Sequence, residues 1–154
     1  MDKFHICAGN IIEKDGKFLL VQETKEIAKG KFHLPCGKLE EKEAVLDAAI
    51  REAEEETGLR VKPRKLIGCY QRVFAPLKNN TVNFIFASDI ISGEIQTSKE
   101  HPIVKFFSLE EIKELNGNDM LRAVWLLEAL QDYLSGKAYD LSAVKTFTID
   151  KADI

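Results

Sequence analysis

The chain has 154 residues, 45% hydrophobic and 31% charged, a composition typical of one globular domain with enough apolar side chains for a core. Its 22 Lys and Arg against 25 Asp and Glu give a formal charge of −3, which argues against a basic protein that binds a nucleic acid polymer through its overall field. Cys7, Cys36 and Cys69 form no C-x-x-C pair and no stretch approaches the ~18 apolar residues of a membrane helix, so we expect a single cytoplasmic domain over residues 1–154, without disulfides or membrane contact.

The first third of the chain has the pattern of short strands. Apolar runs at residues 4–12 and 18–21 flank the turn signal Asp15-Gly16, which predicts a β-hairpin. Residues 25–31 are polar and predict a loop, and residues 32–35 predict a short strand that ends at a proline.

A helical pattern follows at residues 43–57. Its apolar positions recur at helical spacing, and Gly58 supplies a stop signal; the stripe consists of Leu46, Ala49, Ile50 and Ala53.

The second half of the chain returns to strands and then to helices. Strands are predicted at residues 66–74 and 81–88, joined by a loop at 75–80, with a further strand at 104–107. Ser108 and Glu111 have the spacing of a capping box, which predicts a short helix there.

A second helix is predicted from a cap at Asn118 or Asp119 to Gly136, and the tail at 138–154 is only weakly strand-like. This order of elements indicates an α/β (α+β) fold in which a mixed β-sheet is sandwiched between helices.

Acidic residues gather in one segment, because residues 40–56 hold eight acidic and two basic residues and carry a charge of −6. On a helix, Glu52, Glu55 and Glu56 share one face, whereas Asp47 and Glu54 point to solvent. One interpretation is an ordinary solvated face, because exposed like-charge pairs cost only about 0.2–0.5 kcal/mol each. The other is a site for Mg²⁺ or Mn²⁺, the hard cations that carboxylates favour.

The residues around this cluster decide between the two interpretations. Residues 37–59 match the spacing G-x5-E-x7-R-E-U-x-E-E-x-G-U, where U is apolar, through Gly37, Glu43, Arg51, Glu52, Ala53, Glu55, Glu56, Gly58 and Leu59. This segment resembles the Nudix box of the MutT-related pyrophosphohydrolases. The resemblance implies a Nudix fold and hydrolysis of a phosphoanhydride bond by attack of water on phosphorus, with Mg²⁺ as cofactor and Mn²⁺ as the alternative.

The resemblance also implies roles for individual residues. Glu52, Glu55 and Glu56 are the implied metal ligands, and the Gly37 loop is expected to lend backbone groups at the helix start. An ion pair between Arg51 and Glu43 is expected to orient these carboxylates, although Glu43 is equally well explained as a first-turn acid that the helix dipole favours.

The general base is left open between two acids. A box carboxylate such as Glu55 is one candidate, and Glu100, in a later loop, is the other; an idle surface residue is the alternative for Glu100. Gly37, Lys38 and Arg72 are the expected substrate contacts. The three histidines, His5, His33 and His101, are interpreted as structural or exposed.

One position departs from the family pattern, because Cys36 stands where relatives commonly have a second glycine. Cysteine disfavours positive φ, so this substitution bears on the loop geometry.

The expected partner is a small phosphorylated, nucleotide-like molecule, and the expected state is a monomer or homodimer. The segment at residues 133–139 is similar to that of small NudJ-like phosphatases, which act on nucleotide and thiamine-precursor pyrophosphates. The alternatives are an ADP-ribose or nucleotide-sugar pyrophosphatase, suggested by the position of Pro76, and a Nudix-fold regulator that binds nucleotides without hydrolysing them.

Overall fold

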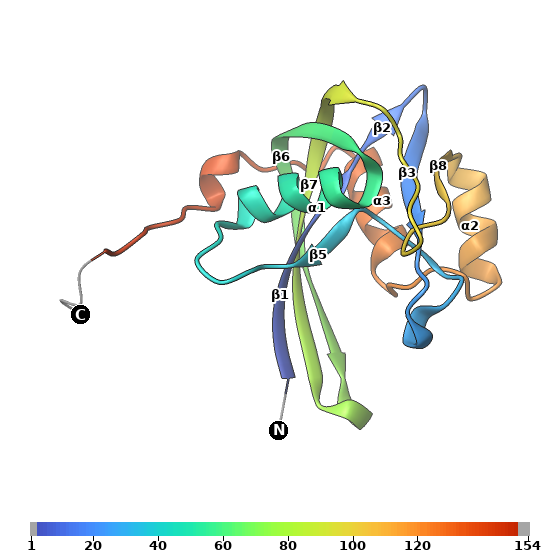
Figure 1. The fold of residues 1–154 in the computed structure, drawn as a ribbon, viewed down its shortest axis with the longest axis horizontal. Helices are drawn as coiled ribbons and strands as arrows, with labels where there is room; N and C mark the ends of the chain where they lie inside the picture. The colour runs from blue at the N-terminus through green and yellow to red at the C-terminus, as the bar shows by residue number, and fades with distance from the viewer. Residues whose placement is uncertain (1–2, 151–154) are drawn as a thin grey trace.

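A computed structural model describes residues 3–150 and contains two β-sheets (Figure 1). In the larger sheet, β1 runs parallel to β7, and β6 and β5 are antiparallel to their neighbours, so the sheet is mixed. Its strands, in spatial order, are β5 (Cys36–Lys38), β1 (Lys3–Ile11), β7 (Asn79–Gly93) and β6 (Leu59–Phe74).

The smaller sheet is built around β3, which pairs with all three of its other strands. Its strands are β2 (Glu13–Lys14), β3 (Lys17–Gln22), β4 (Phe32–His33) and β8 (Val104–Phe107). Asp15 and Gly16 have φ values of 52° and 75°, as the tight turn between β2 and β3 requires. The predicted hairpin is therefore shorter than expected, because residues 4–11 belong to β1 of the larger sheet and only β2 pairs with β3.

Helices cover both faces of the larger sheet. Ala8 and Phe86 pack with α1 (Val45–Thr57), whereas their neighbours Cys7 and Ile85 pack in the cluster that contains α3 (Leu126–Leu134). Adjacent strand residues face opposite ways, so the two helices lie on opposite sides of the sheet. The predicted arrangement of a mixed sheet between helices is confirmed.

Helix α2 (Leu109–Gly117) begins with the predicted capping box. The Ser108 hydroxyl accepts a hydrogen bond from the Glu111 N–H, and the Glu111 carboxylate accepts one from the Ser108 N–H. No helix within residues 3–150 is long and apolar enough to cross a membrane.

The predicted start of the last helix is wrong. Asn118 is the C-terminal cap of α2, and α3 begins only at Leu126. The backbone between these two helices pairs with Phe32. The Met120 carbonyl accepts a hydrogen bond from the Phe32 N–H, and the Arg122 N–H donates to the Phe32 carbonyl. This chain segment therefore lines the edge of β4 instead of forming a helical turn.

Smaller differences concern the boundaries of other elements. Helix α1 begins two residues later than predicted, and β6 and β7 are longer than predicted and enclose the short turn η2 (Ala75–Leu77). The loop at 25–31 contains the turn η1 (Glu26–Ala28), and residues 36–38 form β5, which was not predicted.

The predicted strand character of the tail is almost entirely wrong. Tyr139 exchanges backbone hydrogen bonds with Leu66, and the turn η3 (Leu141–Ala143) follows, but residues 144–150 form no helix or strand. In Figure 1 this segment runs away from the body of the molecule. Residues 151–154 lie outside the described residues.

Candidate functional site

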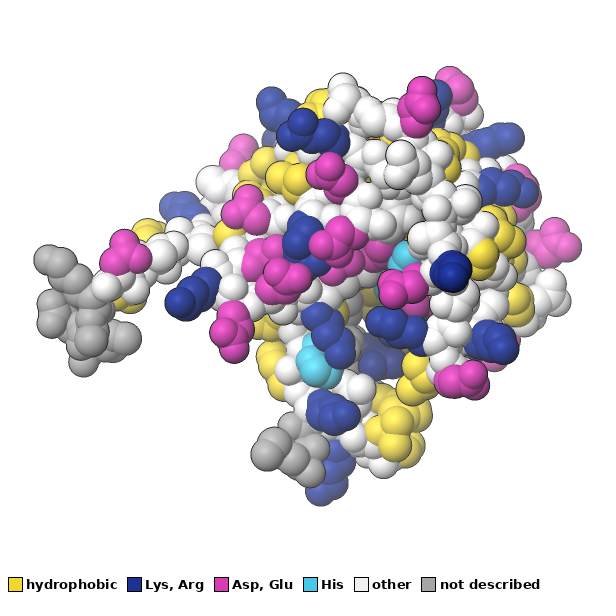
Figure 2. Space-filling view, viewed as in Figure 1, with side chains coloured by type: hydrophobic (Ala, Val, Ile, Leu, Met, Phe, Trp, Pro, Cys, Tyr) yellow, Lys and Arg dark blue, Asp and Glu magenta, His cyan; other side chains and the backbone are white. Residues whose placement is uncertain are grey.

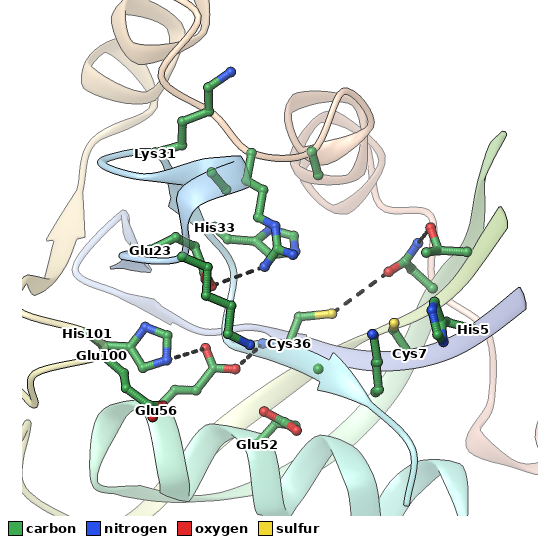
Figure 3. A pocket seen from close by; sticks show the side chains of 18 of the residues that line it. His5, Cys7, Glu23, Lys31, His33, Cys36, Glu52, Glu56, Glu100 and His101 are labelled. Atoms are coloured by element: carbon green, nitrogen blue, oxygen red, sulfur yellow. Dashed lines mark hydrogen bonds and ion pairs between the residues drawn. The ribbon is translucent and has the colours of Figure 1, made fainter. Parts of the chain in front are cut away.

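A cavity of about 930 Å³ opens between the carboxylate face of α1, the first strands and the loop at 98–101. The expected site residues all line it, namely Gly37, Lys38, Arg51, Glu52, Glu55, Glu56, Arg72 and Glu100. Figure 3 shows its interior, with β5 passing above the α1 carboxylates.

The sequence of α1 explains why these carboxylates face the cavity. Ala48, Ala49 and Ala53 are fully buried against the sheet, so the adjoining face of the helix lies beside β5. Gly58 ends the helix in the left-handed conformation, with φ 80° and its N–H donating to the Glu54 carbonyl.

Gly37 provides room for Glu52. It lies in β5, opposite Ala8, and a Cβ on it would overlap the Glu52 carboxylate. The expected place of Gly37 at the start of the helix is wrong, because β5 ends at Lys38 and α1 begins only at Val45. A glycine at this position is explained by the close approach of the Glu52 side chain of α1 to the strand.

The guanidinium of Arg51 holds together the carboxylates on the outer side of the cavity. Its Nε and Nη2 donate to both oxygens of Glu43, over 2.7 and 3.0 Å. Its Nη1 lies 2.8 Å from Glu52 Oε1 and 3.0 Å from Glu55 Oε2, and Nη2 also donates to the Lys38 carbonyl. The ion pair between Arg51 and Glu43 that the sequence left open is present.

This ion pair changes the ionisation of both groups. The hydrogen bonds from Arg51 hold the pKa of Glu43 below its ordinary value, and Glu43 and Glu52 raise the pKa of Arg51 further above its already high value. Both side chains therefore stay charged over the whole neutral range, which suits a role in positioning.

Glu56 has a different environment on the inner side of the cavity. It is 6% exposed, and its Oε1 accepts a hydrogen bond of 3.2 Å from the Cys36 N–H, whereas its Oε2 has no hydrogen-bond partner. Burial, and then the neighbouring Glu52 and Glu23, raise the pKa of Glu56 well above its ordinary value. A buried carboxylate with one unpaired oxygen is a group that a bound cation would compensate.

Cys36 fits where a glycine was expected. It lies in β5 and is not among the described residues with positive φ, so the strand needs no glycine there. Its Cβ and Sγ fill the space beside Gly9. Burial raises the pKa of the Cys36 thiol well above its ordinary value, so a reactive thiolate is disfavoured.

Sequence reasoning did not identify three residues of the inner cavity. Glu23, just after β3, is 4% exposed and lies 3.3 Å from Nη1 of Arg122, and His101 Nε2 lies 3.8 Å from Glu56 Oε2. The sequence gives one indication of Glu23, which is an acidic residue directly after an apolar strand. This pattern is too common to identify a functional site.

Basic side chains face the acidic ones across the cavity. His5, Lys38, Arg72 and Arg122 line it, together with Lys25 and Lys31. Figure 2 shows acidic side chains at the centre of one face, above a hollow bordered by Lys and Arg. Glu100 is an exposed residue at the rim, where its carbonyl accepts a hydrogen bond from the Thr24 hydroxyl.

Buried polar atoms without partners also point to this cavity. In residues 3–150, three buried side-chain atoms lack a hydrogen bond: His33 Nδ1, Glu56 Oε2 and Asn79 Oδ1. All three residues line the same cavity. Because buried polar groups are normally paired, water in the free protein and the polar groups of a bound molecule are the natural partners for these atoms.

Comparisons with known proteins identify the family of this chain. The family model of the NUDIX domain matches residues 3–126. Phosphatase NudJ of Escherichia coli strain K12 is 32% identical over 151 residues, which are 96% of this chain and 94% of that protein. ADP-ribose pyrophosphatase of Methanocaldococcus jannaschii is 34% identical over 110 residues, or 71% of this chain but only 65% of that protein.

A solved structure shows the same arrangement of elements. A Nudix hydrolase from Nitrosomonas europaea superposes with a TM-score of 0.85 at 28% identity, over 94% of this chain and 98% of that one. The α/β Nudix fold is therefore confirmed. The chain belongs to the Nudix family of hydrolases, enzymes that act on phosphoanhydride bonds of small phosphorylated molecules.

Proposed function

We propose that this chain hydrolyses the phosphoanhydride bond of a nucleoside di- or triphosphate, or a related small organic pyrophosphate, with Mg²⁺ and with Mn²⁺ as the alternative. The observation that carries the proposal is one cavity lined both by the carboxylates of α1 and by the cationic side chains of Lys38, Arg72 and Arg122. A polyphosphate bound together with a divalent cation has the charge distribution that complements these two sets of groups.

Three carboxylates are the proposed metal ligands. Glu52, Glu55 and Glu56 come from one helix and line the cavity, and Arg51 orients the first two. The unpaired Oε2 of Glu56 fits a metal ligand on physical grounds, because metal coordination supplies the partner it lacks. A bound Mg²⁺ would neutralise phosphate charge and lower the pKa of a coordinated water.

The remaining residues bind and orient the substrate. Lys38, Arg72 and His5 face the carboxylates and are placed to receive phosphate oxygens, and Gly37 lets the strand and Glu52 approach closely. The proton of the attacking water passes to Glu55 or to Glu100. Glu55 has 58% of its side chain exposed at the mouth of the cavity, where it reaches both water and substrate.

A second candidate is an ADP-ribose or nucleotide-sugar pyrophosphatase. The likeness to an ADP-ribose pyrophosphatase supports it, and the cavity of about 930 Å³ has the size of an ordinary ligand pocket. A regulator that binds nucleotides without hydrolysing them is disfavoured, since such a protein has no need for the complete set of Glu52, Glu55 and Glu56.

The experiment that tests the proposal is a substrate panel. It comprises nucleoside triphosphates, nucleotide sugars, ADP-ribose, dinucleoside polyphosphates and thiamine-pathway pyrophosphates, each assayed for product with Mg²⁺ and with EDTA. We expect Mg²⁺-dependent turnover of at least one class. Binding of a nucleotide without metal-dependent turnover of any compound would instead support the regulator.

Two variants test Glu55 as a metal ligand and Glu100 as a candidate general base. Glu55→Gln is expected to lower kcat at least ~100-fold, the order found when a key electrostatic group is removed. Glu100→Gln is the matched change at the rim, and an unchanged rate there would leave Glu100 as a surface residue. Near-wild-type activity of Glu55→Gln would contradict the assignment of Glu55 as a metal ligand.

A further inference from the structure

We infer that Glu23, Glu56 and His101 form a metal site with a nitrogen ligand, which binds a first-row transition-metal dication such as Mn²⁺ more tightly than Mg²⁺. This inference deepens the proposed function, because it concerns the inner end of the same cavity. It adds to the box carboxylates two ligands that the helix does not supply.

Three separate segments bring these side chains together. Glu23 follows β3, Glu56 comes from the last turn of α1, and His101 belongs to the loop before β8. One ligand atom from each lies within 4.8 Å of the other two. Within residues 3–150, no other group of three His, Cys, Asp or Glu residues meets this condition. Figure 3 shows His101 and Glu23 on the side of Glu56 that faces away from His5.

The hydrogen bonding of His101 leaves one ring nitrogen ready to bind a metal. Its Nδ1 lies 3.1 Å from the carbonyl oxygen of Gln22. A carbonyl oxygen only accepts hydrogen bonds, so Nδ1 carries the ring proton and donates it. In the neutral ring, Nε2 then presents its lone pair, and it faces Glu56 Oε2 at 3.8 Å. A donor bond from the opposite nitrogen to a carbonyl is the usual way in which a metal-binding histidine is oriented.

The oxygen that faces this lone pair has no partner of its own. Glu56 Oε2 is buried without a hydrogen bond, in a residue that is 6% exposed. Within residues 3–150, the ion pairs give Glu56 no Lys or Arg partner, whereas Glu23 has Arg122 at 3.3 Å from its Oε1. Two lone pairs that face each other at 3.8 Å repel unless a proton or a metal cation lies between them, and the third ligand, Glu23, makes the site suited to a metal.

The spacing and the donor types indicate which cation. Two ligands bound to one ion at about 2.1 Å each lie no more than about 4.2 Å apart, which 3.8 Å satisfies. Carboxylates alone favour Mg²⁺, but an imidazole raises the affinity for first-row transition metals relative to Mg²⁺. The inner end of the cavity therefore favours first-row dications over Mg²⁺, and Mn²⁺, the member of this series that also suits carboxylates, is the probe for the experiment.

Electron paramagnetic resonance of bound Mn²⁺ tests this site without any substrate. Full-length protein is titrated with Mn²⁺ alone, and pulsed spectra are examined for coupling to ¹⁴N. We expect the wild type to show this coupling and to bind Mn²⁺ at least ~10-fold more tightly than Mg²⁺ measured by competition. Absence of ¹⁴N coupling in the wild type would overturn the inference.

Variants identify the nitrogen and the second carboxylate. His101→Gln is expected to remove the ¹⁴N coupling and weaken Mn²⁺ binding at least ~10-fold, with less than a ~3-fold change for Mg²⁺. Glu23→Gln weakens Mn²⁺ binding but retains the coupling. His5→Gln, a change to another histidine of the same cavity, is the matched control and retains both.

The alternative outcomes are distinct. Equal weakening of Mn²⁺ and Mg²⁺ binding by His101→Gln would overturn coordination by the imidazole, and a similar loss in His5→Gln would overturn the location of the site. Circular dichroism verifies that each variant is folded. Failure of the hydrolysis panel leaves the Mn²⁺ spectra unaffected, so the two proposals fail separately.

Discussion

The outer end of the cavity, around Arg51, and the inner end, around Glu56, differ in how their negative charge is compensated. At the outer end, the Arg51 guanidinium binds Glu43, Glu52 and Glu55 over 2.7 to 3.0 Å, so a fixed cation compensates part of their charge. At the inner end, Glu56 is more deeply buried and one of its oxygens has no hydrogen bond. The acids of the outer end therefore have a fixed cationic partner before a ligand binds, whereas Glu56 has none from Lys or Arg among the described residues.

Positioning and metal binding place different demands on a carboxylate. Glu43, with both oxygens bound by Arg51, contributes to the shape of the site but gains little from a ligand. A buried group that lacks a partner destabilises the free protein and gains most on binding. The same family signature thus contains residues of both kinds, and their spacing alone does not distinguish them.

The largest expected effect comes from filling the space that Gly37 leaves for Glu52. Gly37→Ala places a Cβ on the Glu52 carboxylate, so Glu52 must move and its contact with Arg51 is disturbed. We expect kcat/KM with Mg²⁺ to fall about 100-fold, because displacements near 1 Å have such effects in active sites. Steady-state kinetics measure this change.

A second glycine provides the control for that variant. A Cβ added to Gly117, at the end of α2, would have no neighbouring atom within 4 Å, so Gly117→Ala is expected to retain full activity. An active Gly37→Ala enzyme would show that the position of Glu52 is not critical.

The next effect concerns His33, a second unpaired group at the inner end. Burial, and then Arg122 and Arg72, lower the pKa of His33 to about 3, so the folded protein keeps it neutral while the unfolded chain protonates it below about pH 6.5. The free energy of unfolding therefore decreases as the pH is lowered below 6.5. Protonation of this histidine in the unfolded chain accounts for a loss of about 1.4 kcal/mol per pH unit.

His33→Phe removes this contribution and retains an aromatic ring beside Trp125. Between about pH 6.5 and about pH 4.5, urea unfolding should show the wild type losing about 2–3 kcal/mol more than the variant. Parallel pH dependences would contradict the unpaired, neutral state of His33.

The smallest effect is expected at the outer end, where Arg51→Lys keeps the charge but loses the planar set of donors. Lysine cannot bind Glu43 through two parallel bonds and also reach Glu52 and Glu55, so we expect kcat/KM to fall about 10-fold. Arg64→Lys is the matched control, since Arg64 pairs with Asp89 and does not line the cavity. Equal losses in both variants would mean that the Arg51 network does not position the carboxylates.

The sequence predicted α1 and its carboxylate face well, because a helix is a local structure and its period is visible in the residues. The cap of α2 was predicted for the same reason, through the reciprocal bonds of Ser108 and Glu111. Failures arose where distant backbone decides the structure. Residues 118–125 resemble the start of a helix, but Phe32 takes the hydrogen bonds of Met120 and Arg122.

The inner end of the site was not predictable for a related reason. Glu23 and His101 are far from the Nudix box in sequence and meet Glu56 only through the packing of β3 and the loop before β8. Neither residue has a neighbour in sequence that reveals its surroundings. Their burial and their proximity to Glu56 are properties of the tertiary structure alone.

Glu56 is a buried carboxyl group whose missing partner is a metal ion, and thermal unfolding of Glu56→Gln with and without Mg²⁺ tests this most directly. Without metal, the variant should unfold at a higher temperature than the wild type, by about 2–4 °C for each kcal/mol that the buried ionisable group costs.

With Mg²⁺, the wild type should be stabilised, whereas Glu56→Gln should require at least ~10-fold more Mg²⁺ for the same rise. A metal-free Glu56→Gln protein that is less stable than the wild type, or one with an unchanged response to Mg²⁺, would contradict the account.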